Sequence, residues 1–194
     1  SMFLSIPASV ALVIGSEQII SALFGYGSFV EKSVLNSSNA LYYFGLGLPA
    51  FALIKVFSTF FFANHDTKTP FYISLVSVLL NILISVYFFK DIGFIIIPIA
   101  TTISSWFNSS MLFIYLKNNN LFEFNKTFFK QFVKIIFASI MMGIFFQFLI
   151  LLFENQLSYA YFFKSAYLLL CVLFTITFYF AVSYFIKAFN YQDI

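Results

Sequence analysis

Apolar residues fall in six long runs separated by short polar breaks. The runs cover approximately residues 2–24, 40–63, 70–89, 92–116, 132–153 and 165–187. A helix needs about 20 apolar residues to cross a hydrocarbon core roughly 30 Å thick, and each run has this length. A transmembrane β-barrel would show alternating segments of about ten residues, which do not occur in this sequence. The pattern therefore predicts an all-α, polytopic transmembrane bundle of about six spanning helices.

Composition agrees with a chain that is surrounded mostly by membrane lipids. Residues of the AVILMFWYC set make up 62% and charged residues 9% of the 194 residues, whereas an ordinary soluble domain is about 45–50% apolar and roughly 25% charged. A soluble domain of this size could not hide so much apolar surface. The net charge of +3 comes from dispersed lysines. These features exclude a soluble enzyme and a nucleic-acid-binding protein.

Lysines in the breaks predict the orientation, because cytoplasmic loops carry an excess of Lys and Arg. Six lysines fall in the second and fourth breaks or near the C-terminus: Lys68, Lys117, Lys126, Lys130, Lys134 and Lys187. Three fall in the first, third and fifth breaks: Lys32, Lys90 and Lys164. The excess places the turn at Lys68, the polar segment 117–131 and the C-terminus in the cytoplasm.

Two ionisable side chains lie inside the apolar runs, Glu17 in the first and Lys55 in the second. An ionisable group at such depth costs a few kcal/mol, so both residues are candidates for substrate binding. Three interpretations remain open: a mutual ion pair, snorkelling of Lys55 to the interface, or a Lys55 that holds an anionic head group in a hydrated cavity. The pair is disfavoured because the two residues differ by roughly 11–12 Å in depth at 1.5 Å per residue.

Oxygen-bearing residues in the third and fourth runs form a candidate cation site. Asn81 and Ser85 are four residues apart and share one helix face, and Ile97 and Thr101 repeat this spacing. Pro98 frees a nearby backbone carbonyl, since its ring blocks a helical hydrogen bond. Such oxygens can bind a hard cation. Asn, Ser and Thr in spans also serve as helix–helix contacts, so both interpretations stay open.

The region around the second run resembles the signature region of a known family. Residues 45–55 read GLGLPAFALIK and residues 61–70 read FFANHDTKTP; supporting matches are IPA at 6–8, LFGYGSF at 23–29 and ATTISSWFN at 100–108. These stretches closely resemble the MurJ (MviN) family of lipid II flippases, within the multidrug/oligosaccharidyl-lipid/polysaccharide exporter superfamily. The residues themselves match well through about residue 116; beyond it, only the pattern of hydrophobic and polar segments is similar.

The resemblance implies that the chain is the C-terminal portion of a fourteen-helix flippase fold, equivalent to helices nine to fourteen. Residues 1–116 would then be four helices of the C-terminal transport lobe, and 117–131 a cytoplasmic interfacial connector. Residues 132–194 would be two final helices that form a lipid-tail groove. The missing N-terminal lobe, which holds most of the family's essential cationic residues, would be the partner of this chain.

The resemblance also implies a function: flipping of lipid II from the cytoplasmic to the periplasmic face of the bacterial inner membrane, for cell-wall synthesis. It implies no catalysis, no cofactor and no nucleic acid, and it makes Lys55 and Glu17 the substrate-binding candidates. Two alternatives remain. The first is another exporter of the superfamily that moves a different lipid-linked oligosaccharide or a drug. The second, an intramembrane enzyme that uses Glu17, is disfavoured because this carboxylate lacks a partner acid, base or metal.

Na⁺ is the coupling ion that the resemblance suggests. One family member has a sodium site in this lobe, and an ungapped comparison places its ligands at Asn81, Ser85, the carbonyl of Ile97 and Thr101. The aspartate expected at position 85 is serine in this chain. This departure weakens the expectation of a cation site.

Overall fold

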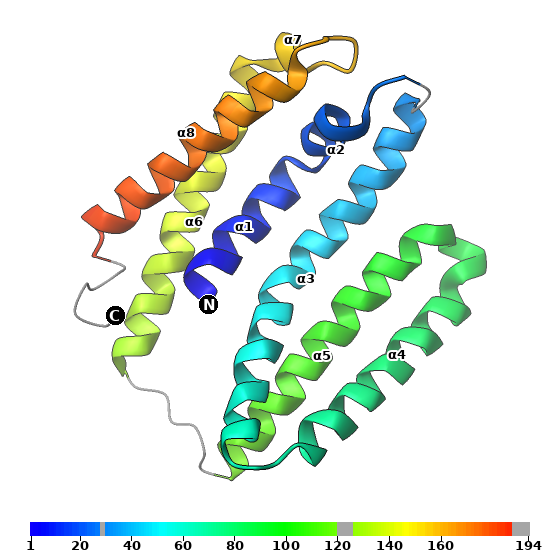
Figure 1. The fold of residues 1–194 in the computed structure, drawn as a ribbon, viewed down its shortest axis with the longest axis vertical. Coiled ribbons are helices and arrows are strands. Elements are labelled where there is room, and N and C mark those ends of the chain that lie inside the picture. The colour runs from blue at the N-terminus through cyan, green and yellow to red at the C-terminus, as the bar shows by residue number, and fades with distance from the viewer. Residues whose placement is uncertain (28–29, 120–125, 188–194) are drawn as a thin grey trace.

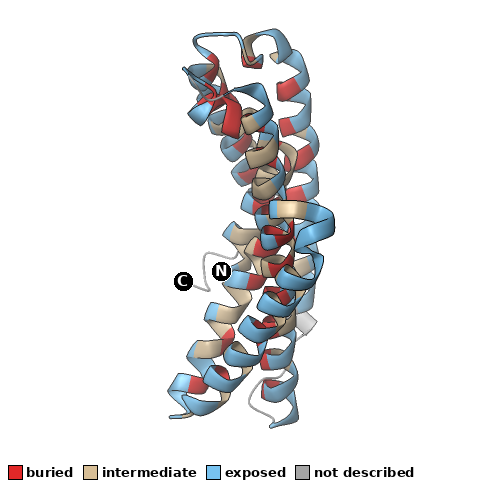
Figure 2. Cartoon of the chain, turned by 90° about the vertical axis from the view of Figure 1, so that its right-hand side faces the viewer, coloured by how far each residue is buried: buried red, intermediate tan, exposed pale blue. Residues whose placement is uncertain are grey.

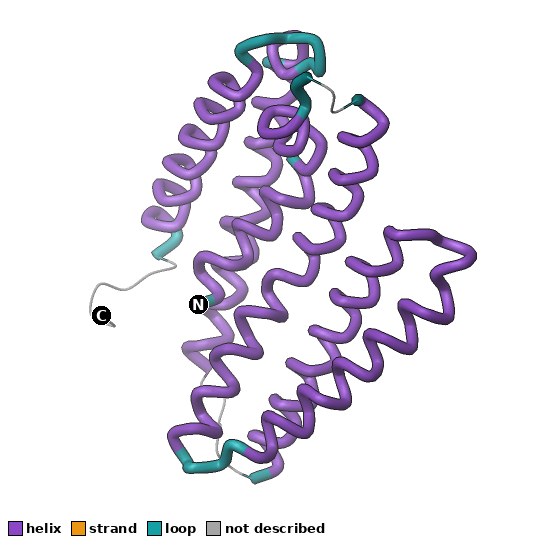
Figure 3. Tube along the Cα trace, turned by 45° about the vertical axis from the view of Figure 1, so that its right-hand side comes forward, coloured by secondary structure: helices purple, strands orange, loops and turns teal. Residues whose placement is uncertain are grey.

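The computed structural model describes residues 1–27, 30–119 and 126–187, without the side chains of 126–128. All regular structure in these ranges is helical, and short loops join the long helices (Figures 1 and 3). The elements are α1 (Met2–Ile14), α2 (Ser16–Phe24), α3 (Glu31–Ala63), α4 (Lys68–Ile92), the 3₁₀ helix η1 (Gly93–Ile95), α5 (Ile96–Asn118), α6 (Lys126–Leu152), α7 (Glu154–Leu157) and α8 (Lys164–Phe185).

The prediction of an all-α transmembrane bundle is confirmed for the described residues. Four helical stretches are long and apolar enough to cross a membrane, or five if the bent pair α1–α2 counts as one span. One of these stretches, Lys68–Asn118, is 51 residues long and folds back at η1, so that α4 and α5 lie side by side (Figure 1). Gly93 turns this corner with a φ of 74°, which glycine adopts readily. The first predicted run therefore corresponds to the bent pair α1–α2, and the other five correspond to α3, α4, α5, α6 and α8.

The long helices lie in a row in the order α8, α6, α1, α3, α5 and α4, each packed mainly against its neighbours in the row (Figure 1). Seen from the side, exposed residues alternate with buried ones along the length of the layer (Figure 2). Many exposed residues are large and apolar, such as Leu83, Val86 and Ile144. Exposed apolar surface on this scale needs lipid or further protein against it.

Two helices begin earlier than the apolar runs predict. The structure begins α3 at Glu31, so the polar stretch 36–39, expected as a break, forms helical turns. Ser38 Oγ donates to the carbonyl of Leu35 over 2.9 Å, which satisfies the hydroxyl inside the helix. The structure also begins α6 at Lys126, within the segment predicted as a connector. The rest of that prediction falls partly on 120–125, outside the described residues.

The expectation of one continuous helix over 2–24 is wrong, because the chain bends by 77° between α1 and α2. Gly15 occupies the break and is buried against α6: a Cβ at this position would lie 2.6 Å from Phe146 Cε1. Glycine is a poor helix former, and here only glycine leaves room for the aromatic ring. The break thus lies at a Gly-Ser pair, where helices commonly bend, and it places Gly15 directly against α6.

Two helical prolines free carbonyls that other helices then use. Proline cannot donate to the carbonyl four residues earlier. Pro49 thus frees the carbonyl of Gly45, which accepts a hydrogen bond from Ser9 Oγ of α1 over 2.7 Å. Pro7 similarly frees the carbonyl of Phe3, which accepts from Tyr179 Oη of α8 over 2.7 Å. These bonds tie α1 to α3 and to α8.

Replacing Tyr179 with phenylalanine is expected to destabilise the fold by about 1–2 kcal/mol, because the Phe3 carbonyl would lose its partner in an apolar surrounding. The side chain of Tyr179 is 3% exposed, so water cannot easily replace it. Thermal unfolding in detergent should report the change. The matched control is Tyr184→Phe, at an exposed position near the end of the same helix; an equal loss in both variants would contradict the prediction.

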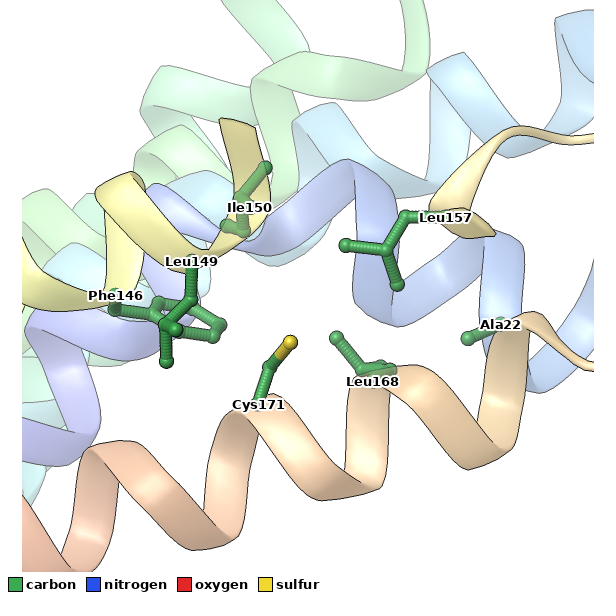
Figure 4. Close-up of a cluster of buried hydrophobic side chains, with 7 residues drawn as sticks. All are labelled: Ala22, Phe146, Leu149, Ile150, Leu157, Leu168 and Cys171. Atoms are coloured by element: carbon green, nitrogen blue, oxygen red, sulfur yellow. The ribbon is translucent and has the colours of Figure 1, made fainter. Parts of the chain in front are cut away.

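An apolar cluster lies where α2, α6, α7 and α8 meet (Figure 4). Its buried members are Ala22, Phe146, Leu149, Ile150, Leu157, Leu168 and Cys171. The thiol of Cys171 points among aliphatic side chains in this cluster (Figure 4). The cysteine therefore acts as a small apolar residue.

Candidate functional site

Lys55 lies in the C-terminal half of α3, beside the beginning of α1. A hollow of about 500 Å³ is lined there by Ser1, Leu4, Ser5, Leu48, Phe51, Ala52 and Lys55. Lys55 is exposed and is the charged side chain of this otherwise mainly apolar lining. Within the described residues, it makes no hydrogen bond or ion pair. Its ammonium group is therefore free to attract an anion next to an apolar surface.

Glu17 lies elsewhere, in the first turn of α2 beyond the bend, and its side chain is exposed. A carboxylate is favourable at the N-terminal end of a helix, because the free N–H groups there carry partial positive charge. No ion pair joins Glu17 to Lys55 in the part of the chain that the structure describes. The structure therefore does not bring the two substrate-binding candidates together.

Three of the four cation-binding candidates are joined in one hydrogen-bonded chain between α4 and α5. Asn81 Nδ2 donates to Thr101 Oγ1 over 3.1 Å and to Ser104 Oγ over 3.3 Å. Thr101 Oγ1 in turn donates to the carbonyl of Ile97 over 2.8 Å. These hydrogen bonds join α4 to α5 along the hairpin.

Ser85, the fourth candidate, lies one turn from Asn81 on α4. Its Oγ is buried and has no hydrogen-bond partner among the described residues. A buried hydroxyl without a partner is costly and calls for an explanation. The other three candidates carry an amide, a carbonyl and a hydroxyl oxygen, which are the atoms that a hard monovalent cation would bind. The cation site therefore stays a prediction.

Two residues of structural importance escaped the sequence analysis. Ser104 shares the Asn81 amide with Thr101, and its position three residues after Thr101, on the same helix face, could have indicated this role. Lys164 entered the analysis only as a loop charge, yet its side chain is 1% exposed. Its burial requires the carbonyl of Gly25 at the end of α2, which is far away in the sequence, in addition to the nearby Tyr159.

Long apolar helices that expose many large apolar side chains define the protein as a multi-pass α-helical membrane protein. The family model described as lipid II flippase MurJ matches residues 1–189. The chain belongs to this family, as the resemblance in the sequence indicated.

Individual relatives agree with this assignment. The probable lipid II flippase MurJ of Rickettsia prowazekii (strain Madrid E) is 29% identical over 199 residues, which cover 99% of this chain and 38% of that protein. The protein of the same name from Rhizobium meliloti (strain 1021) is 38% identical over 116 residues, or 60% of this chain and 22% of the relative.

A solved structure has the same fold. It is described as lipid II flippase MurJ in an inward closed conformation, and it superposes with a TM-score of 0.77 and 28% sequence identity. The superposition covers 96% of this chain and 37% of that structure. The chain therefore spans less than two fifths of the length of each of these relatives.

Proposed function

We propose that this chain is the C-terminal portion of a flippase that moves lipid II from the cytoplasmic to the periplasmic face of the bacterial inner membrane. The observation that carries the proposal is the family match over residues 1–189. The missing N-terminal lobe would complete the transport cavity, and no covalent chemistry would take place. Neither a cofactor nor a nucleic acid would take part.

In this mechanism, Lys55 attracts the anionic head group of the substrate. The ammonium group stands at the edge of an apolar hollow, where Coulomb attraction is stronger than in bulk water. The apolar lining suits the first part of a polyprenyl chain, while the rest of the tail stays in lipid. Glu17, beyond the bend, would contact a different part of the substrate, since it lies on a different element.

Depletion of the full-length protein tests the proposal. Lipid II synthesis should continue while delivery of lipid II to the periplasmic face stops, as measured with a probe that acts only on outward-facing lipid II. Complementation with a plasmid copy should restore delivery. Delivery that continues after depletion in a strain without a second flippase would contradict the proposal and favour a different lipid-linked cargo.

We further propose that Na⁺ binds between α4 and α5 at Asn81, Ser85, the Ile97 carbonyl and Thr101. Thr101→Val removes the hydroxyl that Asn81 and Ile97 share, so the Na⁺ concentration for half-maximal transport should rise roughly tenfold or more. The control is Thr177→Val, an exposed threonine of α8. An unchanged Na⁺ dependence in a well-folded Thr101→Val protein would contradict this site.

The orientation is testable by cysteine labelling of the intact inner membrane. Val30→Cys, at an exposed position just before α3, should react with an impermeant reagent from outside. Asn119→Cys, at the end of α5, should react only after the membrane is opened. The native Cys171 is buried and should not interfere. The reverse labelling pattern would overturn the orientation that the lysines predict.

A further inference from the structure

A buried lysine lies where α2 ends and α8 begins. The side chain of Lys164 is 1% exposed, whereas lysine is almost never fully buried unless its charge is compensated. Its Nζ donates to the carbonyl of Gly25 over 2.6 Å and to the carbonyl of Tyr159 over 2.7 Å. The rings of Tyr26 and Tyr159 lie 4.4 and 4.5 Å from the same Nζ.

These contacts compensate the charge without a carboxylate among the described residues. Gly25 is the residue at the C-terminal end of α2, where the carbonyl ends of a helix carry partial negative charge and favour a cation. The faces of the two tyrosine rings add cation–π attraction, which is stronger in a desolvated place. The ammonium group therefore joins three segments: the end of α2, the loop after α7 and the beginning of α8.

The position of this group matters because α6, α7 and α8 pack against the rest of the chain mainly through α1 and α2. The 77° bend leaves α2 as a short limb of nine residues, too short to hold its direction by its own hydrogen bonds. Packing against α3 holds one side of α2, and a fixed point at its far end would join it to α8 as well.

We propose that Lys164 is a positioning residue that holds the α2 limb against the beginning of α8. We call this contact the Lys164 latch; it comprises Lys164, the carbonyls of Gly25 and Tyr159, and the rings of Tyr26 and Tyr159. Through the latch, the bent pair α1–α2 and the long helices α6 and α8 would move as one rigid unit. If the proposed flippase function holds, a substrate-tail groove formed by the last two helices would then move together with the bent first span.

Distances between spin labels test the latch in the full-length protein, in lipid nanodiscs and without substrate. The labels are placed at Leu23→Cys in α2 and Leu169→Cys in α8, both exposed positions, with Cys171 and any other native cysteine replaced. Lys164→Met keeps the length of the side chain and removes its charge and donors. The latched population should then fall roughly tenfold to a hundredfold relative to the released one, seen as a longer and broader distance distribution.

Lys164→Arg should keep most of the population with the short label distance, because arginine retains the charge and the hydrogen-bond donors. If Lys164 only filled space, the Met and Arg variants would give the same distance distribution. Lys32→Met, at an exposed lysine in the first turn of α3, is the control and should change nothing. Gly25→Ala disturbs the latch from the other side, since its Cβ would lie 3.0 Å from Lys164 Nζ and 2.5 Å from the carbonyl oxygen of Ser21.

Gly25→Ala should therefore lengthen the distance between the two spin labels. If Lys164→Met does not accumulate in the membrane, this variant tests the latch in its place. A distance distribution that stays at its parent position in Lys164→Met, or in Gly25→Ala where only that variant accumulates, would overturn the latch. Because no substrate is present, this outcome does not depend on whether lipid II is the cargo.

Discussion

Lys55→Met is expected to lower lipid II flipping by roughly tenfold to a hundredfold, with normal membrane insertion. The substitution keeps an apolar side chain of similar length and removes the charge from the hollow beside α1. A charge-assisted hydrogen bond to a phosphate oxygen contributes about 1.5–3 kcal/mol, which corresponds to this range of rates if the contact forms during transport. Lys55→Arg keeps the charge and should retain much of the activity.

The matched control for this prediction is Lys90→Met, at an exposed lysine in the last turn of α4. Lys90→Met removes one positive charge from the protein, as Lys55→Met does, but Lys90 does not line the hollow. Flipping should be measured in proteoliposomes at equal protein content, together with complementation of a depleted strain. Full activity of Lys55→Met would contradict a role in head-group binding. Lys55 would then only extend its aliphatic stem along the membrane and place its charge at the interface, which is called snorkelling.

Features that depend on neighbouring residues could be predicted from the sequence. The turn between α3 and α4 is an example, because its polar residues and Pro70 lie together in the chain. His65 adopts a positive φ of 58° there, and Asp66 Oδ1 accepts from the N–H groups of Lys68 and Thr69 at the start of α4. The Thr69 hydroxyl and N–H hold the pKa of the Asp66 carboxyl below its ordinary value.

The contact between the helix faces that carry the cation-binding candidates was partly predictable for a similar reason. A spacing of four residues places Asn81 with Ser85, and Ile97 with Thr101, on one face of each helix. The corner at Gly93 then brings the two faces together, with Asn81 donating to Thr101. The sequence could not show that the Asn81 amide divides its hydrogen bonds between Thr101 and Ser104, because that depends on how the two helices are rotated.

Contacts between distant segments escaped prediction. Residues 2–24 form one apolar run with no proline at the break; the bend lies at the Gly15-Ser16 pair, and the ring of Phe146 in α6 packs beside this glycine. Lys164 looks like any charge that flanks a span, and one of the two carbonyls that compensate it belongs to Gly25 at the end of α2, 139 residues away. Hydropathy measures the tendency of a segment to leave water and carries no information about such partners.

Gly143→Leu is expected to destabilise the protein by about 1–3 kcal/mol, because α1 and α6 touch at this glycine and the larger side chain overpacks the contact. A Cβ at Gly143 would lie only 2.7 Å from Val10 Cγ1 and 2.9 Å from Ile14 Cδ1. Small residues let membrane helices approach closely, and in lipid this packing is a main source of helix association.

The measurement is thermal unfolding or protease resistance of the full-length protein in detergent. Ala181→Leu supplies the control, since it introduces the same side chain at an exposed position of α8 and should have little effect. Equal stability of the two variants would show that the protein accommodates the larger side chain at Gly143 and would contradict the prediction. Loss of stability in Gly143→Leu alone would establish that close packing of α1 against α6 at this glycine stabilises the protein, in addition to any contribution from the contact between α2 and α8.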